Sequence, residues 1–175
     1  IALFLTNNIW IPLSKNLPRK RIRDILKSVP PDMFICDGYD ELDNFTKYTK
    51  KIFLFKSITK QNFKKININF NNLINKISFN ETAFIYFTSG STGVSKGIKV
   101  SHKNIISDVF AQVKHLHSFS LQKKNTKLVF GDYYDTAFSI FFDIFFPAIY
   151  LRAAISPGLK KEEILLPVEH FVKIK

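Results

Sequence analysis

Apolar blocks alternate with polar stretches in the first part of the chain, and their spacing predicts both helix and strand. Residues 1–13 are mainly apolar and are expected to be extended. Residues 18–29 place their apolar side chains at helical spacing and are followed by two prolines, so a helix is expected there. Residues 33–36 form a short apolar run between polar residues, which is typical of a buried strand. This order predicts a strand–helix–strand unit.

The middle of the chain carries first a weak pattern and then a strong one. Residues 40–80 mix Lys, Asn and Thr with single aromatics, and predict one strand at 52–55 and a loop or irregular helix at 61–80. Residues 83–88 read Ala-Phe-Ile-Tyr-Phe-Thr, an aromatic run that leads directly into Ser-Gly and predicts a strand. Residues 98–100 predict a second, shorter strand after an intervening loop.

The last part of the chain predicts two long helices and a further strand. Ser101 is a suitable N-cap for a helix whose apolar residues recur at helical spacing as far as Leu116. Residues 128–130 predict a strand, and residues 136–151 predict a buried helix that is broken near Pro147. Because strands and helices alternate along the chain, the expected fold is α/β, with a mixed, largely parallel sheet flanked by helices.

Composition narrows the possible function classes. The formal net charge is +12, but it comes mostly from lysines that are scattered along the chain. A nucleic-acid-binding protein usually concentrates its positive charge on one face, so no nucleic-acid partner is expected. Cys36 is the only cysteine, which excludes an internal disulfide and a cysteine-based metal site and fits a reducing, cytoplasmic location.

Residues 138–155 are apolar over about the length of a membrane-spanning helix. Asp143 lies near the middle of this segment and costs about 3 kcal/mol on insertion scales. Pro147 interrupts the helix, and Arg152 shortens its uncharged part. A buried core helix is therefore the preferred interpretation, and no membrane span is expected. Membrane attachment through residues 138–155 is retained as an alternative.

A loop with phosphate-binding character follows the strand predicted at 83–88. Residues 88–97 read Thr-Ser-Gly-Ser-Thr-Gly-Val-Ser-Lys-Gly. Glycines let the backbone adopt positive φ and approach a ligand closely, while amides and hydroxyls can point at phosphate oxygens. Lys96 adds a mobile positive charge. The loop therefore predicts a site that wraps the phosphates of a nucleotide.

Other known loop motifs do not match these residues. A Walker loop needs Gly-Lys-Ser/Thr, whereas here Ser95 precedes Lys96 and Gly97 follows it. The dinucleotide fingerprint Gly-x-Gly-x-x-Gly is also absent from the loop. Residues 93–97 do match the hydrolase pattern Gly-x-Ser-x-Gly. A nucleophile elbow, however, joins a strand directly to a helix, and the residues after Gly97 are β-like.

Residues 88–97 resemble the phosphate-loop signature of the adenylate-forming superfamily, which includes acyl-CoA synthetases and nonribosomal-peptide adenylation domains. The signature is commonly Thr-Ser-Gly-Ser/Thr-Thr-Gly-x-Pro-Lys-Gly, and this chain differs only in having Ser95 at the proline position. Residues 98–104, Ile-Lys-Val-Ser-His-Lys-Asn, are similar to the strand and helix start that follow the loop in that family. Residues 11–14 and 143–147 resemble an upstream family segment and the helix that lines the acid pocket.

The resemblance implies a reaction. In this family a carboxylate attacks the α-phosphorus of ATP, giving an acyl-adenylate and pyrophosphate, and a thiol of CoA or of carrier-protein phosphopantetheine then takes the acyl group. ATP, Mg²⁺, a carboxylic acid and an acyl or peptidyl carrier protein are the cofactors and partners that follow. Lys96 is the expected catalytic residue, since it neutralises charge on the leaving pyrophosphate. The expected nucleotide-binding residues are Thr88, Ser89, Gly90, Ser91, Thr92, Gly93, Lys96 and Gly97.

The resemblance leaves the substrate acid open. In amino-acid-activating relatives an aspartate on the pocket helix binds the α-ammonium group of the substrate. The resemblance places Phe138 at that position. Asp135 takes this role only if the chains are aligned with a shift, and Asp143 could instead cap or pair within the core. Asp135, Phe138 and Asp143 are therefore the candidate substrate-binding residues for an amino, fatty or aromatic acid.

The later family segments that help to hold magnesium, bind the ribose and supply a C-terminal lysine are not found in the 175 residues. Residues 1–175 are thus expected to be part of the large N-terminal AMP-binding (adenylation) domain, without its start and without the C-terminal lid domain, and to be inactive alone. A non-catalytic ATP-binding module is the alternative. No metal site is expected, because His102, His115 and His117 lack carboxylate or cysteine neighbours at ligand spacing. Solvated histidines are expected instead.

Overall fold

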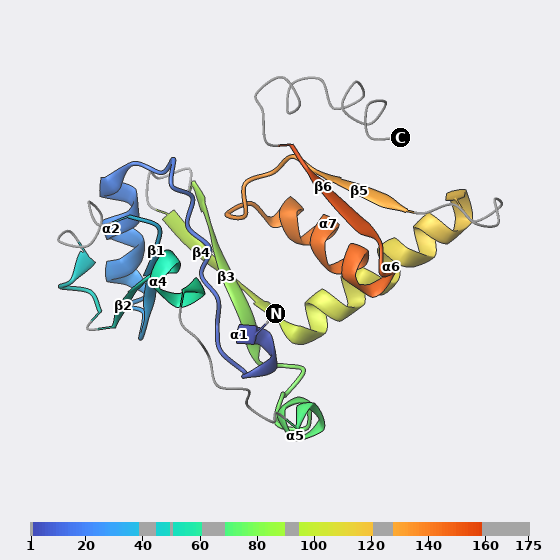
Figure 1. Ribbon diagram of the computed structural model, residues 1–175, viewed down its shortest axis with the longest axis horizontal. Helices are drawn as coiled ribbons and strands as arrows, with labels where there is room; N and C mark the ends of the chain where they lie inside the picture. The colour runs from blue at the N-terminus through green and yellow to red at the C-terminus, as the bar shows by residue number, and fades with distance from the viewer. Residues whose placement is uncertain are drawn as a thin grey trace.

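The computed structural model describes residues 2–38, 45–49, 51–60, 69–89, 95–120 and 128–158. Apart from the short helices α1 (Ala2–Leu5) and α5 (Phe70–Ile74), their helices and strands lie in three groups (Figure 1). α2, β1, β2 and α4 form one group, the strands β3 and β4 cross the middle, and α6, α7, β5 and β6 form the third. The strands pair as a parallel β1–β2 sheet, an antiparallel β3–β4 sheet and a parallel β5–β6 sheet. The expected mixed α/β fold is confirmed.

The first group contains α2 (Arg19–Ser28), β1 (Phe34–Cys36), β2 (Ile52–Leu54) and α4 (Phe55–Thr59). α2 turns its buried residues, Ile25 and Leu26, toward the interior. The helix predicted at 18–29 and the strand predicted at 33–36 are confirmed. The strand predicted at 52–55 is one residue shorter, because its last residue begins α4.

The expectation that residues 1–13 are extended is only partly correct. Residues Ala2–Leu5 form the short helix α1, since Ala and Leu are strong helix formers. Two residues after the end of α1, Asn7 adopts a positive φ of 55°, a conformation that asparagine tolerates better than most residues. The backbone N–H of Asn8 then donates to the carbonyl of Leu3 at 2.8 Å. The extended part of the segment begins only after this turn.

One short helix lies in the described part of residues 61–80. α5 (Phe70–Ile74) is capped by Asn69, whose side-chain oxygen accepts a hydrogen bond from the backbone N–H of Asn72 at 3.3 Å. Residues 61–68 are outside the described residues. In the described part of this segment, the expected loop or irregular helix is thus a short helix of five residues with a side-chain cap at its start.

The central hairpin consists of β3 (Thr82–Ser89) and β4 (Ser95–Ser101), and the N-terminal segment pairs with its other edge. The N–H of Trp10 donates to the carbonyl of Ala83 at 3.0 Å, and the N–H of Ile85 donates to the carbonyl of Trp10 at 2.9 Å. The chain at Trp10 therefore pairs with β3 in the parallel direction, along the edge of β3 that does not face β4. Both strands predicted around the loop are confirmed, and each is longer than expected.

α6 (His102–Ser120) follows β4 without a break, and its start matches the predicted cap. The Ser101 hydroxyl accepts a hydrogen bond from the N–H of Asn104 at 3.1 Å. In return, the side-chain oxygen of Asn104 accepts from the N–H of Ser101 at 3.0 Å. This reciprocal pair satisfies two backbone donors at the helix start, as a capping box does.

The third group is built on α7 (Ser139–Tyr150), which contacts α6 on one side and the parallel strands β5 (Val129–Asp132) and β6 (Ala154–Pro157) on the other. The predicted strand at 128–130 is confirmed as β5. The predicted break near Pro147 is wrong, because α7 continues through this residue. Pro147 cannot donate a helical hydrogen bond, but its ring is almost fully buried, and this packing offsets the missing donor.

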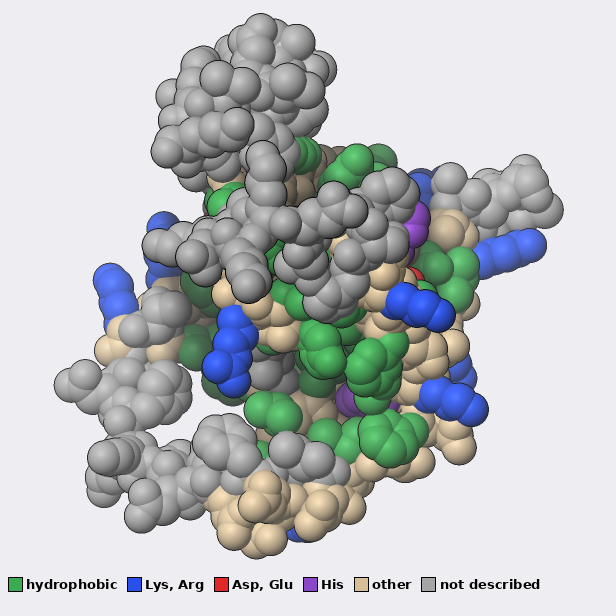
Figure 2. Space-filling model, turned by 90° about the vertical axis from the view of Figure 1, so that its right-hand side faces the viewer, with side chains coloured by type: hydrophobic (Ala, Val, Ile, Leu, Met, Phe, Trp, Pro, Cys, Tyr) green, Lys and Arg blue, Asp and Glu red, His purple; other side chains and the backbone are tan. Residues whose placement is uncertain are grey.

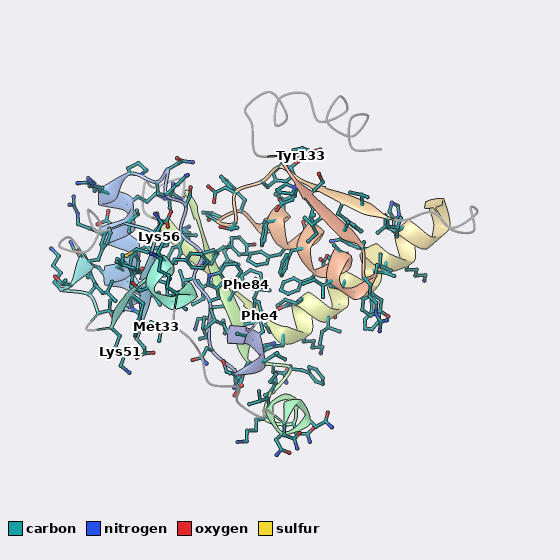
Figure 3. The ribbon with its side chains drawn as sticks, viewed as in Figure 1. Phe4, Met33, Lys51, Lys56, Phe84 and Tyr133 are labelled. Atoms are coloured by element: carbon teal, nitrogen blue, oxygen red, sulfur yellow. The ribbon has the colours of Figure 1, made fainter. Side chains whose placement is uncertain are left out.

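Aromatic rings fill the space where the hairpin, the N-terminal segment and α7 meet. Phe84 stacks on Phe142 with ring centroids 4.0 Å apart. Trp10 meets the edge of Phe142 at 5.4 Å, and Phe4 meets Phe146 at the same distance. Figure 3 shows Phe4 and Phe84 in the interior of this region. These rings form one core that connects elements far apart in the sequence.

Large hydrophobic side chains are also exposed in places. Figure 2 shows a face on which hydrophobic side chains gather, with lysines and arginines around them. Ile106 and Phe110 of α6 and Ile149 and Tyr150 of α7 are among the exposed residues, and the rings of Phe110 and Tyr150 lie 5.6 Å apart. Within the described residues, no helix has the length and apolar character needed to span a membrane.

Ser101→Ala is expected to lower the free energy of unfolding by about 1 kcal/mol, because it removes the side chain that caps α6. Urea unfolding of the protein, followed by circular dichroism, measures this change. Ser107→Ala is the matched control, since Ser107 is an exposed serine inside the same helix. An equal effect of the two substitutions would show that the cap does not stabilise the protein.

Candidate functional site

The hairpin register brings the two ends of the predicted phosphate loop together. Thr88 lies directly opposite Lys96, and Ser89 lies opposite Ser95. Both the Thr88 and Lys96 side chains are exposed. The predicted ligands Gly90, Ser91, Thr92 and Gly93 lie outside the described residues. The described part of the site is therefore a hydroxyl and an ammonium group side by side at the open end of two paired strands.

The alternation of side chains along a strand places these two groups on a particular face of the hairpin. Side chains two residues apart share a face, so Thr88 shares its face with Tyr86 and Phe84. Their cross-strand partners on the same face are Lys96, Ile98 and Val100. This face begins with polar groups at the loop end and becomes aromatic and aliphatic toward the other end. We call it the site face of the hairpin.

Gly97 lies on the opposite face, inside β4 rather than in the loop. A Cβ atom built at Gly97 would lie 3.1 Å from the Phe87 ring and 3.3 Å from the Ile85 side chain. These contacts are tighter than most real Cβ contacts, so the glycine gives room for the Phe87 ring to cover the strand. Packing against Phe87 and Ile85 therefore accounts for the presence of glycine at position 97. The predicted contact of Gly97 with the nucleotide stays a prediction.

A pocket of about 170 Å³ opens beside the site face. Its lining comes from both strands of the hairpin and from α6 and α7, and consists of Phe84, Tyr86, Val100, Asn104, Ile105, Asp108, Ser139, Phe142, Asp143 and Phe146. Three of these residues belong to the site face. The pocket therefore lies against the same face of the hairpin that carries Thr88 and Lys96 at the loop end.

Only one of the three candidate substrate-binding residues lines this pocket. Asp143 does so from the middle of α7. Asp135 is engaged elsewhere, since its carboxylate accepts hydrogen bonds from the Ser14 hydroxyl and from the N–H of Ala137, the latter at 3.0 Å. Phe138 precedes the first residue of α7 and has 63% of its surface exposed.

Asp108 is a pocket residue that sequence reasoning missed. It lies on α6, and its carboxylate accepts a hydrogen bond from the Gln112 side chain at 2.8 Å. Burial raises the pKa of Asp143, and the nearby carboxylate of Asp108 raises it further. The available signal was the spacing of Asn104 and Asp108, which places both on one face of a helix. This signal does not show that α7 brings a second carboxylate to the same face.

His102, the first residue of α6, is buried, which contradicts the expectation of a solvated histidine. Its ring packs edge-on against Phe4 at 6.2 Å, and its Nε2 atom has no hydrogen-bond partner. Burial lowers the pKa of His102, and the negative charge of Glu81 opposes this shift. His115 is exposed, as expected.

In the described part of the chain, no group of three or more His, Cys, Asp or Glu side chains is placed to hold a metal ion.

Solved structures that resemble this chain define its class. An adenylation domain of Vibrio cholerae, solved with glycyl-adenosine-5′-phosphate, matches 99% of this chain and 35% of its own chain, with a TM-score of 0.68 and 20% identity. o-Succinylbenzoate coenzyme A synthetase of Bacillus subtilis, solved with ATP and magnesium, matches 97% of this chain and 43% of its own chain, with a TM-score of 0.71 and 14% identity. The fold is that of the N-terminal domain of adenylate-forming enzymes.

The family itself follows from the sequence match. Residues 1–155 match the model of the AMP-binding enzyme family, so the chain belongs to this family of adenylate-forming enzymes. Cyclosporin synthetase of Tolypocladium inflatum is 28% identical over 109 residues, which cover 61% of this chain and 1% of that protein. The D-alanine–D-alanyl carrier protein ligase of Listeria monocytogenes is 31% identical over 101 residues, 56% of this chain and 19% of that protein. The chain thus spans a small part of the length of these relatives.

Acidification is expected to destabilise the protein through His102. Its pKa is lowered from 6.5 in the folded state, so the unfolded chain binds a proton more readily. Above pH 6.5 His102 is mainly neutral in both states, and the protein keeps its full stability with respect to this residue. As the pH falls from 6.5 toward the folded-state pKa, protonation favours the unfolded chain, and the free energy of unfolding decreases. We expect His102→Phe, which keeps a ring against Phe4 but cannot titrate, to flatten the pH dependence of the free energy of unfolding below pH 6.5.

The measurement is urea unfolding at a series of pH values on either side of this range. His115→Phe is the control, because His115 is an exposed histidine of the same helix. A pH dependence that is unchanged in His102→Phe would contradict the assignment.

Proposed function

We propose that the protein activates a carboxylic acid with ATP as an acyl-adenylate, and that a thiol of CoA or of a carrier protein then takes the acyl group. Membership of the AMP-binding family supports adenylate formation. A carrier protein ligase and a coenzyme A synthetase among the similar proteins support a thiol acceptor. The observation that carries the proposal is the hairpin register, which sets Lys96 opposite Thr88 at the loop end.

The described groups at this end of the hairpin fit a triphosphate. Lys96 offers a positive charge and Thr88 a hydroxyl donor, and neither β3 nor β4 contains an acidic residue that would repel phosphate. Gly90, Ser91, Thr92 and Gly93 are proposed to complete the cradle with backbone amides and hydroxyls. Bound Mg²⁺ neutralises phosphate charge in such reactions.

Lys96 is proposed to act on the leaving pyrophosphate. Negative charge builds up on this group as the carboxylate attacks the α-phosphorus, and a prepositioned cation stabilises charge that develops in the transition state. The strand ladder fixes the backbone of Lys96 while its exposed side chain can reach the phosphates. A substrate-binding role is proposed for Asp143 because it lines the pocket. Asp135 and Phe138, which precede α7, stay candidate substrate-binding residues.

We further propose that residues 1–175 are part of a larger adenylation domain. The chain corresponds to 35% of a solved adenylation domain, which supports this proposal. The groups that bind ribose and complete the metal site are then supplied by other parts of the complete protein. Activity is accordingly to be tested on the complete gene product.

Lys96→Ala is expected to reduce acid-dependent ATP–pyrophosphate exchange by roughly a hundredfold or more, because the charge that stabilises the leaving group is lost. Lys96→Arg should retain part of the activity. Lys99→Ala is the matched control, since Lys99 is an exposed lysine of the same strand on the opposite face of the hairpin.

Two results would count against the proposal. Equal exchange rates in the Lys96→Ala and Lys99→Ala variants would show that Lys96 does not act on the leaving pyrophosphate. Absence of exchange with every acid in a broad panel, while ATP still binds, would identify a non-catalytic ATP-binding module instead.

A further inference from the structure

His102 is a buried titratable group that the proposed reaction does not use. It is the first residue of α6 and has 8% of its surface exposed. Its ring meets the edge of Phe4 at 6.2 Å, and its Nε2 atom has no hydrogen-bond partner. A neutral imidazole can occupy such a place, but an imidazolium there requires either water or a counter-ion.

The groups around His102 do not supply a sufficient counter-ion. α1, which contributes Phe4, and α5, which contacts α1, contain no titratable residue. On α6 the next residue is Lys103, whose side chain is exposed. Glu81, which precedes β3, already accepts a hydrogen bond from the Asn7 side chain. Burial lowers the pKa of His102 more than the charge of Glu81 raises it, so a proton on the ring requires water.

α1 is the element that water displaces most easily. It is a helix of four residues, and a single turn has little stability of its own. The backbone N–H groups of Thr6, Asn7 and Asn8 close it, at 3.1, 3.3 and 2.8 Å from their acceptors. α6, in contrast, has 19 residues and a capping pair at its start. Detachment of α1 therefore hydrates the His102 ring at a lower cost than opening of α6.

Phe4 connects α1 to the wall of the pocket beside the site face. It meets the edge of Phe146 of α7, with ring centroids 5.4 Å apart. Phe146 is one of the residues that line the pocket. Detachment of α1 would therefore remove a supporting contact from this wall.

We propose that His102 and Phe4 form an acid-sensitive latch: when His102 binds a proton, α1 detaches from the core while the hairpin and α7 stay in place. The open form binds the proton more tightly, because its His102 ring is hydrated. The population of the open form therefore rises as the pH falls below 6.5 and levels off below the folded-state pKa. Since one proton is taken up, the rise is at most about tenfold per pH unit.

Hydrogen–deuterium exchange of the complete protein tests the latch at a series of pH values above and below 6.5. Mass spectrometry follows the amides of Thr6, Asn7 and Asn8, and each rate is divided by the intrinsic exchange rate at the same pH. We expect their protection to fall by up to about tenfold per pH unit below 6.5. The N–H of Ile85, which donates to the carbonyl of Trp10 at 2.9 Å, should stay protected.

Variants assign the effect to His102. In His102→Phe, which keeps a ring against Phe4 but cannot titrate, the protection of α1 should no longer depend on pH. If this variant does not fold, His102→Gln serves the same purpose. His115→Phe, which alters an exposed histidine of the same helix, should keep the pH dependence of the unaltered protein.

Three results would overturn the proposal. Protection of α1 in the unaltered protein that does not change with pH would exclude a latch. An equal loss of protection at Ile85 would show that the whole fold opens instead of α1 alone. A pH dependence that persists in the His102 variants would assign the proton to another group. The first two results come from the unaltered protein, so they do not depend on the folding of a variant.

Discussion

The stacking of Phe84 on Phe142 is the contact on which the arrangement of the molecule depends. The ring centroids are 4.0 Å apart and the ring planes differ by 20°. Aromatic pairs of this kind contribute about 0.5–1.5 kcal/mol beyond the area they bury. The backbone of Trp10 bonds to β3 on both sides of Phe84, and the Trp10 ring meets the edge of Phe142. This contact therefore fixes the hairpin, the N-terminal segment and α7 in one geometry.

The same contact determines what surrounds the pocket. Phe84 and Phe142 both line it, so the rings that join hairpin and helix also form one of its walls. Asp143 follows Phe142 on α7, and Asp108 approaches from α6, which packs on α7. Packing of the helices thus brings the two carboxylates to the pocket, and the Asp108 carboxylate also accepts a hydrogen bond from the Gln112 side chain. Because the walls exclude water from part of their surface, the folded state gives Asp143 a raised pKa.

Local sequence patterns were sufficient to predict most of the helices and strands. The pocket could not be predicted in this way, because it depends on how distant segments pack together. The Ser101 cap and the aromatic strand before the loop depend on neighbouring residues, and both are found as predicted. The continuation of α7 through Pro147 could not be predicted, since it depends on burial of the ring by distant segments. The burial of His102 and the approach of Asp108 to Asp143 depend in the same way on how helices pack. Five central loop residues, 90–94, are outside the described residues.

The hairpin register limits how the sequence of this region can change during evolution. Thr88 and Lys96 share a face with the pocket residues Tyr86 and Val100 only because the two members of each pair, Thr88 with Tyr86 and Lys96 with Val100, are an even number of positions apart on their strand. Deletion of a single residue within either strand would move every side chain beyond it to the opposite face. The length of the connecting loop is free of this parity rule. Homologous sequences should therefore accept insertions between the strands far more often than within them.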